Sequence, residues 1–253
     1  MMKKCQKLNL IVFMCMVVAT SLLFYISQMA AQPSFNEKPW HLQPTVHEDT
    51  LSAEYKSLYK ILGRQRVHQQ LKNTSKLQII ILVDAWGVPV QESMLAQDFS
   101  FFKDVPHVYA LHHRLANRTK HAERTEFQND YPENIYIFGG DSMEYDRPKY
   151  IREIGFANAV FCQFCSDSVM IEKIDSLVAQ DSLKFIAWTT QSSRTGDRDS
   201  LRHSLQLIAS FAKRHPEAMI VVQGTHRPIL GTPEIRRSYK AHWVPVAILN
   251  NRE

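Results

Sequence analysis

The chain has 253 residues, 45% of them hydrophobic, and a formal net charge of +5 at pH 7. That length suits one folded domain rather than two once the N-terminal segment is set aside. The basic residues are scattered rather than clustered with aromatic side chains, so the composition argues against a nucleic-acid-binding protein.

The N-terminal segment predicts a membrane anchor. Residues 1–7 contain three lysines, and residues 8–26 carry no charged side chain. An uncharged run of roughly 20 residues can cross a bilayer as a helix, and the positive-inside rule places its basic flank in the cytoplasm. The alternative is a cleaved signal peptide, for which Met29-Ala30-Ala31 is a poor cleavage site.

These features divide the chain into three parts. We expect a cytoplasmic basic stub and transmembrane anchor over residues 1–27, a polar linker over 28–47 and a folded domain over 48–253. The prediction is a single-pass protein of the cytoplasmic (inner) membrane, with its soluble domain outside the cytoplasm in the periplasm.

The folded domain shows strand patterns that alternate with helical patterns. A helix is expected over residues 52–71, and further helices over 147–154, 168–179 and 200–214. Strands are expected over residues 77–83, 107–111, 134–138, 159–164, 183–189, 219–223 and 243–249. This alternation predicts an α/β fold with a mainly parallel sheet and helices on both faces.

The first of the long strands delivers a carboxylate to its end. Residues 79–83 are all aliphatic, which is typical of a strand covered on both faces, and Asp84 follows directly. In open parallel sheets the carboxyl ends of the strands line the ligand crevice. Asp84 is therefore a candidate site residue, and the alternative is that it only caps loop amides.

Two further patterns come from spacing alone. Cys162 and Cys165 form a lone C-x-x-C pair, which in an exported protein predicts a local disulfide more readily than a zinc or redox site. Asp199 and His203 are four residues apart, which places both on one face of a helix. Asp199 also suits an ordinary helix N-cap.

Four segments together resemble a known family. Residues 83–86 read Val-Asp-Ala-Trp, residues 117–123 read Asn-Arg-Thr-Lys-His-Ala-Glu, residues 134–156 contain Phe-Gly-Gly-Asp and end in Gly-Phe, and residues 221–228 contain Gly-Thr-His. In this order they resemble the motifs of lipoteichoic-acid-synthase-like and sulfatase-like membrane-anchored proteins, which are members of the alkaline-phosphatase-like superfamily. The resemblance covers roughly residues 77–249.

The resemblance implies metal-assisted transfer or hydrolysis at phosphate esters of envelope lipids or glycans. Asp84 and His226 would bind a divalent cation, Mn or Zn, and Thr119 would share that metal as the activated nucleophile. Arg147 would grip the phosphate. Two-metal members of the superfamily carry a pair like Asp199 and His203, and His242 would complete such a second site.

The departures from the family pattern fall on the chemistry. Thr225 stands where the family has a metal-binding aspartate, which removes one ligand charge. The family's histidine-bearing substrate loop corresponds to residues 189–195, where Arg194 is the candidate anion clamp. Two hypotheses remain: a working phosphotransferase or phosphodiesterase, and a catalytically degenerate relative that binds an anion or a partner. Thr119 as a helix-start residue and Arg147 as a surface residue are the alternatives that fit the second.

Overall fold

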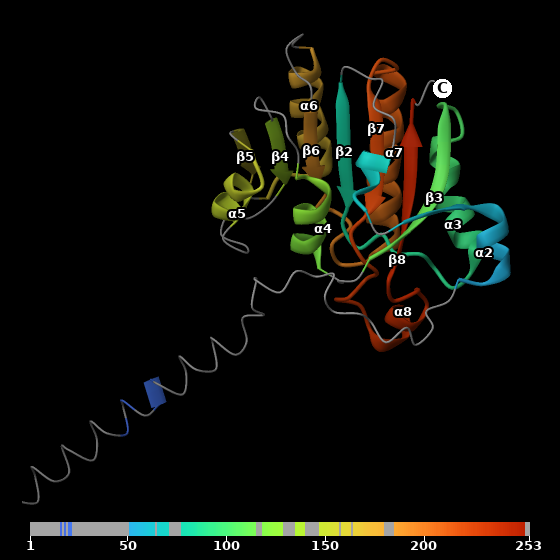
Figure 1. Ribbon diagram of the computed structural model, residues 1–253, viewed down its shortest axis with the longest axis horizontal. Helices are drawn as coiled ribbons and strands as arrows, with labels where there is room; N and C mark the ends of the chain where they lie inside the picture. Colours follow the sequence, from blue (N-terminus) through green and yellow to red (C-terminus); the bar gives the residue numbers. More distant parts are fainter. Residues whose placement is uncertain are drawn as a thin grey trace, which may run out of the picture. The chain divides into compact units, whose positions relative to one another are not determined.

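The computed structural model (Figure 1) describes residues 51–63, 65–70, 77–114, 118–128, 135–139, 147–156, 158–162, 164–179 and 185–250, together with positions 16, 18, 20 and 21. The chain divides into two units, Met1–Thr45 and Val46–Glu253. Almost all of the predicted anchor and the whole of the predicted linker lie outside the described residues. Within the described residues, no helix combines the length and the apolarity that a membrane span requires.

Val46–Glu253 is built on one mixed sheet. Its strands are β1 (Lys60–Leu62), β2 (Gln78–Val83), β3 (His107–His113), β4 (Ile135–Gly139), β5 (Asn158–Cys162), β6 (Phe185–Thr189), β7 (Met219–Gly224) and β8 (Trp243–Leu249). They lie in the order β1-β3-β8-β7-β2-β6-β4-β5. Every neighbouring pair is parallel except the two that include β8. The carboxyl ends of the other strands therefore share one edge.

Helices cover both faces of this sheet, as the alternation predicts. They are α2 (Ala53–Leu58), α3 (Glu92–Phe99), α4 (Thr119–Glu126), α5 (Arg147–Glu153), α6 (Asp167–Val178), α7 (Arg198–Arg214) and α8 (Pro233–Arg237), with 3-10 turns η1 (Val67–Gln70) and η2 (Ser100–Phe102). Figure 1 shows α6 and α7 running alongside the strands.

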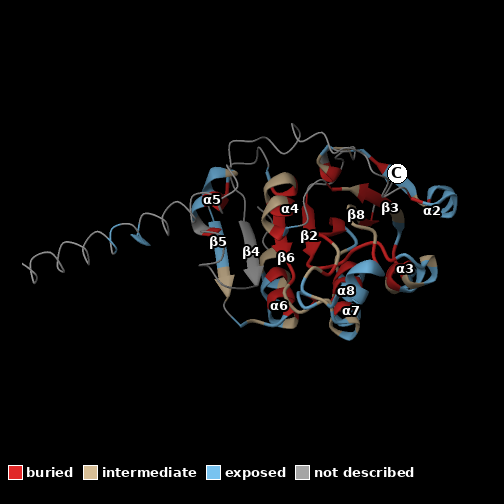
Figure 2. Cartoon of the chain, turned by 90° about the horizontal axis from the view of Figure 1, so that it is seen from below, coloured by how far each residue is buried: buried red, intermediate tan, exposed pale blue. Residues whose placement is uncertain are grey.

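The central strand β2 contributes side chains to two hydrophobic clusters, one on each face of the sheet. Side chains alternate between the faces of a strand. Ile79 and Ile81 pack in the cluster that includes residues of α3, α6 and α7. Ile80 and Leu82 pack in the cluster that includes residues of α4 and α5. All six residues of β2 are buried, and Figure 2 shows the strand in red.

The predicted helix over residues 52–71 is wrong after its first part. The helix ends at Leu58, and Lys60–Leu62 instead pairs in parallel with Ala110–His112 of β3. Pairing with a distant strand overrides the local helical spacing, because register with β3 buries Leu62. No helical pattern in the sequence predicts α3, α4 or α8, although the helix-start alternative for Thr119 agrees with its place as the first residue of α4.

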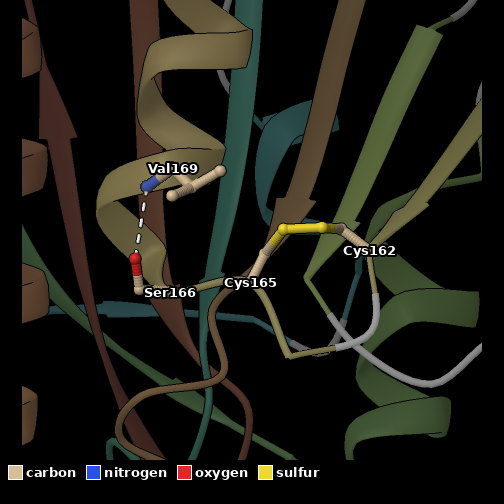
Figure 3. Close-up of a disulfide and its surroundings, with 4 residues drawn as sticks. All are labelled: Cys162, Cys165, Ser166 and Val169. Carbon is tan, nitrogen blue, oxygen red and sulfur yellow. Dashed lines mark hydrogen bonds between the residues drawn. A yellow bond between two sulfur atoms is a disulfide. The ribbon is translucent and has the colours of Figure 1, made fainter.

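The Cys162–Cys165 pair forms the local disulfide that its spacing suggests (Figure 3). It closes the turn between β5 and α6. Directly after it, the Ser166 side chain accepts a hydrogen bond from the Val169 amide at 3.4 Å and caps α6. The disulfide therefore lies directly before the capped start of α6, whose first residue is Asp167.

Candidate active site

The site begins with three polar residues that follow three adjacent strands. In the register of the sheet, Leu82 pairs with Thr189 of β6 and Val83 pairs with Gly224 of β7. The amides of Thr190 and Thr225 continue this pairing, donating to the carbonyls of Leu82 at 2.9 Å and Val83 at 3.1 Å. Asp84 is consequently held between Thr190 on one side and Thr225 on the other.

A tight turn directs the Asp84 carboxylate. Ala85 has a φ of 56°, a left-handed conformation that is uncommon for any residue except glycine. Its amide donates to Asp84 Oδ1 and to Thr225 Oγ1, both at 3.1 Å. Gly224 makes room for the turn, because a Cβ there would lie 1.8 Å from the Trp86 carbonyl oxygen. Backbone strain of this kind is typical of functional sites.

Thr119 and His226 meet at this carboxylate. Thr119 is the first residue of α4, but its hydroxyl does not cap the helix; it donates to Asp84 Oδ1 at 2.8 Å. His226 Nε2 lies 3.2 Å from Thr119 Oγ1 and 3.4 Å from Asp84 Oδ1. All three side chains are buried. The structure thus brings together three residues that are far apart in the sequence, and the geometry favours the nucleophile interpretation of Thr119.

Asp84 Oδ1, Thr119 Oγ1 and His226 Nε2 are spaced as the ligand atoms of one divalent cation would be. Ligands of a tetrahedral metal at about 2.0 Å lie roughly 3.3 Å apart, close to the 2.8, 3.2 and 3.4 Å seen here. His226 Nδ1 donates to the Arg227 carbonyl at 2.7 Å, which leaves the Nε2 lone pair directed to the site. The fit is weak in charge, because Asp84 supplies the single carboxylate of this set.

Thr225 stands where the resemblance places a metal-binding aspartate. Its hydroxyl donates to Asp84 Oδ1 at 2.8 Å. Asp84 Oδ1 therefore accepts hydrogen bonds from the hydroxyl groups of Thr119 and Thr225, and these bonds compensate much of its negative charge without a cation. Among the described residues, no group of three or more His, Cys, Asp and Glu side chains gathers as a metal site.

Arg147 and Arg194 line a pocket together with Asp84 and Thr119. The pocket is small, and residues 189–191 also line it. Arg147 is only 3% exposed, so it is not the solvated surface residue of the alternative hypothesis. Its Nη2 donates to Glu123 Oε1 at 3.3 Å. Both arginines that the sequence assigned to anion binding thus lie at the pocket that contains Thr119.

The second metal site does not assemble in the same way. Asp199 is 90% exposed and pairs with Arg202 on the surface of α7, and His203 is also exposed. The N-cap of α7 is Asp197, not Asp199. His242 is half-buried before β8, with its ring 5.8 Å from that of His113. None of these residues lines the pocket of Asp84.

Two acidic residues near the site were missed from the sequence. Glu123 is completely buried and accepts from Thr189 Oγ1 at 2.8 Å as well as from Arg147. It lies four residues after Thr119, and this spacing on a helix was the available signal. Asp167 accepts from backbone amides of the loop that contributes Arg194. No sequence pattern marks it, because its partners are distant in the chain.

A second buried charged cluster braces the end of β7. Arg114 donates to the Gly224 carbonyl at 3.3 Å and to Glu126 at 3.4 Å. Burial alone would raise the pKa of Glu126, but the interaction with His68 and the charge of Arg114 outweigh it and hold the pKa at about 2. Burial lowers the pKa of the neighbouring His112 to about 4.

The mixed-sheet domain has an alkaline-phosphatase-like fold, and the likeness extends to a lipoteichoic acid synthase. The recognition from the sequence is confirmed. The lipoteichoic acid synthase LtaP from Listeria monocytogenes matches with a TM-score of 0.52 and 12% identity, over 69% of this chain and 65% of that one.

A protein in the alkaline phosphatase superfamily from Vibrio parahaemolyticus matches with a TM-score of 0.53 and 12% identity, over 73% of this chain and 63% of that one. The chain thus spans less than two thirds of the length of these two structures. At the level of sequence, no family model and no curated protein matches. The likeness is therefore one of fold.

Proposed function

We propose that this chain is a metal-dependent transferase or hydrolase of phosphate esters, with Thr119 as its nucleophile. The observation that carries the proposal is the position of Thr119 Oγ1, 2.8 Å from Asp84 Oδ1 and 3.2 Å from His226 Nε2. A threonine hydroxyl attacks poorly unless a base or a cation activates it. Here the hydroxyl lies against a carboxylate and an imidazole.

The residues have distinct parts in this proposal. Asp84 and His226 would hold the cation, Mn or Zn. When bound, the cation lowers the pKa of the Thr119 hydroxyl and offsets charge on the phosphoryl oxygens. Thr119 stands at the N-terminus of α4, where the helix dipole favours the negative charge that develops on its oxygen. Arg147 and Arg194 would bind the phosphoryl group.

The reaction then has two halves. Thr119 Oγ gives up its proton and forms a bond to phosphorus while the bond from phosphorus to the ester oxygen breaks, so the first alcohol leaves with that proton and the phosphoryl group stays on Thr119. In the second half, water or an acceptor hydroxyl displaces Thr119. Water makes the chain a hydrolase, and an acceptor alcohol makes it a transferase.

We extend the proposal to the cell envelope. The uncharged run over residues 8–26 and its basic flank support a membrane anchor, and the Cys162–Cys165 disulfide supports an oxidising compartment. The substrate would be a phosphate-containing envelope lipid or glycan. LtaP is by its name a lipoteichoic acid synthase, which agrees with this substrate class.

Thr225 supports a second candidate, an anion-binding relative without turnover. Its hydroxyl bond to Asp84 satisfies the carboxylate that a cation would need. In this alternative Arg147 and Arg194 still bind an anion, but Thr119 serves only the hydrogen-bond network.

Metal content and turnover separate the two candidates. The purified protein is analysed for bound metal and assayed with bis(4-nitrophenyl) phosphate in the presence of Mn²⁺ or Zn²⁺. We expect about one bound metal, and a loss of turnover of at least roughly 100-fold in Thr119→Ala. Thr125→Ala is the matched control, since among the described residues its hydroxyl bonds to the His121 carbonyl on the same helix and to no site residue. Equal turnover in the two variants would exclude catalysis by Thr119.

A further inference from the structure

The loop between β6 and α7 brings Arg194 to the pocket. Its first turn closes where the Arg194 amide donates to the Gln191 carbonyl at 3.1 Å, and the Gly196 amide donates to the Ser193 carbonyl at 2.9 Å. Gly196 has a φ of 77°, and a Cβ there would lie 2.6 Å from Pro228. The loop is therefore compact, and its position relative to the pocket depends on what holds it from outside.

One side of the loop is tied to the backbone of Asp84. The Asp84 amide donates to Thr190 Oγ1 at 3.0 Å, and Ser193 Oγ donates to the Asp84 carbonyl at 2.6 Å. These bonds hold Thr190, directly before the turn, and Ser193, within it, next to the backbone of Asp84. The amides of Gln191 and Ser192, which lie between these two residues, bond to a different partner.

The other side of the loop is held by Asp167, the first residue of α6. Its Oδ1 accepts from the Gln191 amide at 2.9 Å, and its Oδ2 accepts from the Ser192 amide at 3.3 Å. Ser204 Oγ of α7 donates to Oδ2 at 2.6 Å. One carboxylate thus joins α6, α7 and the turn that precedes Arg194.

Burial of the Asp167 carboxylate is energetically unfavourable unless other groups compensate its charge. The residue is 1% exposed, and among the described residues no basic side chain pairs with it. A buried carboxylate normally has a cationic partner. Here neutral donors and the N-terminus of α6 carry the compensation, and two of those donors are amides of the pocket loop.

We propose that Asp167 is a positioning residue of the anion site: it holds the Gln191–Arg194 turn so that the Arg194 guanidinium is in place for a phosphoryl group. This inference rests on the proposed function for the identity of the anion. The Cys162–Cys165 disulfide lies directly before Ser166, the N-cap of α6, and Asp167 is the first residue of that helix.

A first experiment measures the loop directly in the full-length protein. Hydrogen–deuterium exchange is compared for Asp167→Asn and for Asp175→Asn. Asp175 is the matched control, because it lies on the same helix and pairs with Arg214 and His215 away from the pocket. We expect exchange at Gln191 and Ser192 to be at least 10-fold faster in Asp167→Asn alone. Unchanged exchange there overturns the proposal.

A second experiment tests the action through Arg194. Affinity for inorganic phosphate is measured by calorimetry for Asp167→Asn, Arg194→Gln and the double variant. We expect each single change to weaken binding roughly 10-fold, and the double variant to be no weaker than Arg194→Gln, because the two residues act as one unit. If Asp167 acted only through its charge, its removal would tighten phosphate binding.

The outcomes separate this inference from the proposed function. A protein that binds phosphate in the expected pattern but turns over no phosphodiester refutes the enzyme and leaves the role of Asp167 intact. Independent, additive effects of the two substitutions overturn the role of Asp167. So does a wild-type protein that does not bind phosphate, or binding that is unchanged or tighter in Asp167→Asn.

Discussion

Replacement of Thr225 by aspartate would add the charge that the proposed metal site lacks, and its cost can be worked from the structure. Thr225 Oγ1 lies 2.8 Å from Asp84 Oδ1, so the new carboxylate would face Asp84 at about that distance. Two unit charges roughly 3 Å apart repel by about 5 kcal/mol at an effective dielectric of about 20. Protonating one aspartate at pH 7 instead costs about 4 kcal/mol. We therefore expect the metal-free Thr225→Asp protein to lose about 4 kcal/mol of stability.

The same substitution should make the protein depend on metal. A cation between two carboxylates removes the repulsion, so Mn²⁺ or Zn²⁺ should recover the lost stability in Thr225→Asp. Thr225→Asn is the neutral control of matching size. Denaturant unfolding in chelator and in added metal measures both effects. If Thr225→Asp is as stable as Thr225→Asn in chelator, or gains nothing from metal, the placement of Thr225 at the cation site is wrong.

Three further predictions concern the frame around the site. Gly224→Ala should cost about 3 kcal/mol of unfolding free energy, because its Cβ would lie 1.8 Å from the Trp86 carbonyl; wild-type stability by urea unfolding would refute the tight approach. His112 has a pKa lowered from 6.5 to about 4 by burial, so the unfolded chain binds the extra proton and about 3 kcal/mol of stability is lost as the pH falls from 6.5 to 4. Replacing His112 by Gln should flatten that slope, and an unchanged slope would contradict its assignment. The double variant Cys162→Ser, Cys165→Ser should lose roughly 2 kcal/mol, as expected for a very short loop, and a larger loss with unfolding of the sheet would show that the disulfide holds more than its own turn.

The elements that the sequence predicts well are those whose apolar pattern is local. The run over residues 79–83 forms β2 as expected, and the spacing that predicts a helix over residues 200–214 matches α7 closely. Alternation of such segments was enough to predict the parallel sheet. It could not predict β8 as antiparallel, because direction within a sheet depends on connections rather than on side-chain pattern.

Helix α4 was missed for a specific physical reason. Its buried face consists of Thr119, Ala122, Glu123 and Glu126, so it has almost no apolar periodicity. The carboxylates are buried because arginines and threonines from other elements satisfy them. A polar face with helical spacing indicates a site-bearing helix, and apolar patterns alone do not detect it.

The sequence indicated several residues of the candidate site, but it did not indicate the contacts that they make. Asp84 was indicated by its place at the end of a buried strand, and Thr119, Arg147 and His226 by the resemblance. Asp84, Thr119 and Arg147 line one pocket, and His226 contacts Asp84 and Thr119. Asp199 and His203 had suitable spacing but face solvent on α7, since spacing within a helix does not say which face turns to the sheet. Asp167 acts on residues 24 and 25 positions away, which no local pattern reveals.

Mass spectrometry can locate the phosphoryl group that the proposed reaction places on Thr119. The protein is incubated with metal and bis(4-nitrophenyl) phosphate, quenched in acid and digested. We expect one 4-nitrophenylphosphoryl group on Thr119 in the wild-type protein and in Thr125→Ala, because attack on this diester releases one 4-nitrophenol and retains the other, and none in Thr119→Ala. Turnover with the phosphoryl group on another residue, or turnover that survives Thr119→Ala, would contradict the proposed reaction.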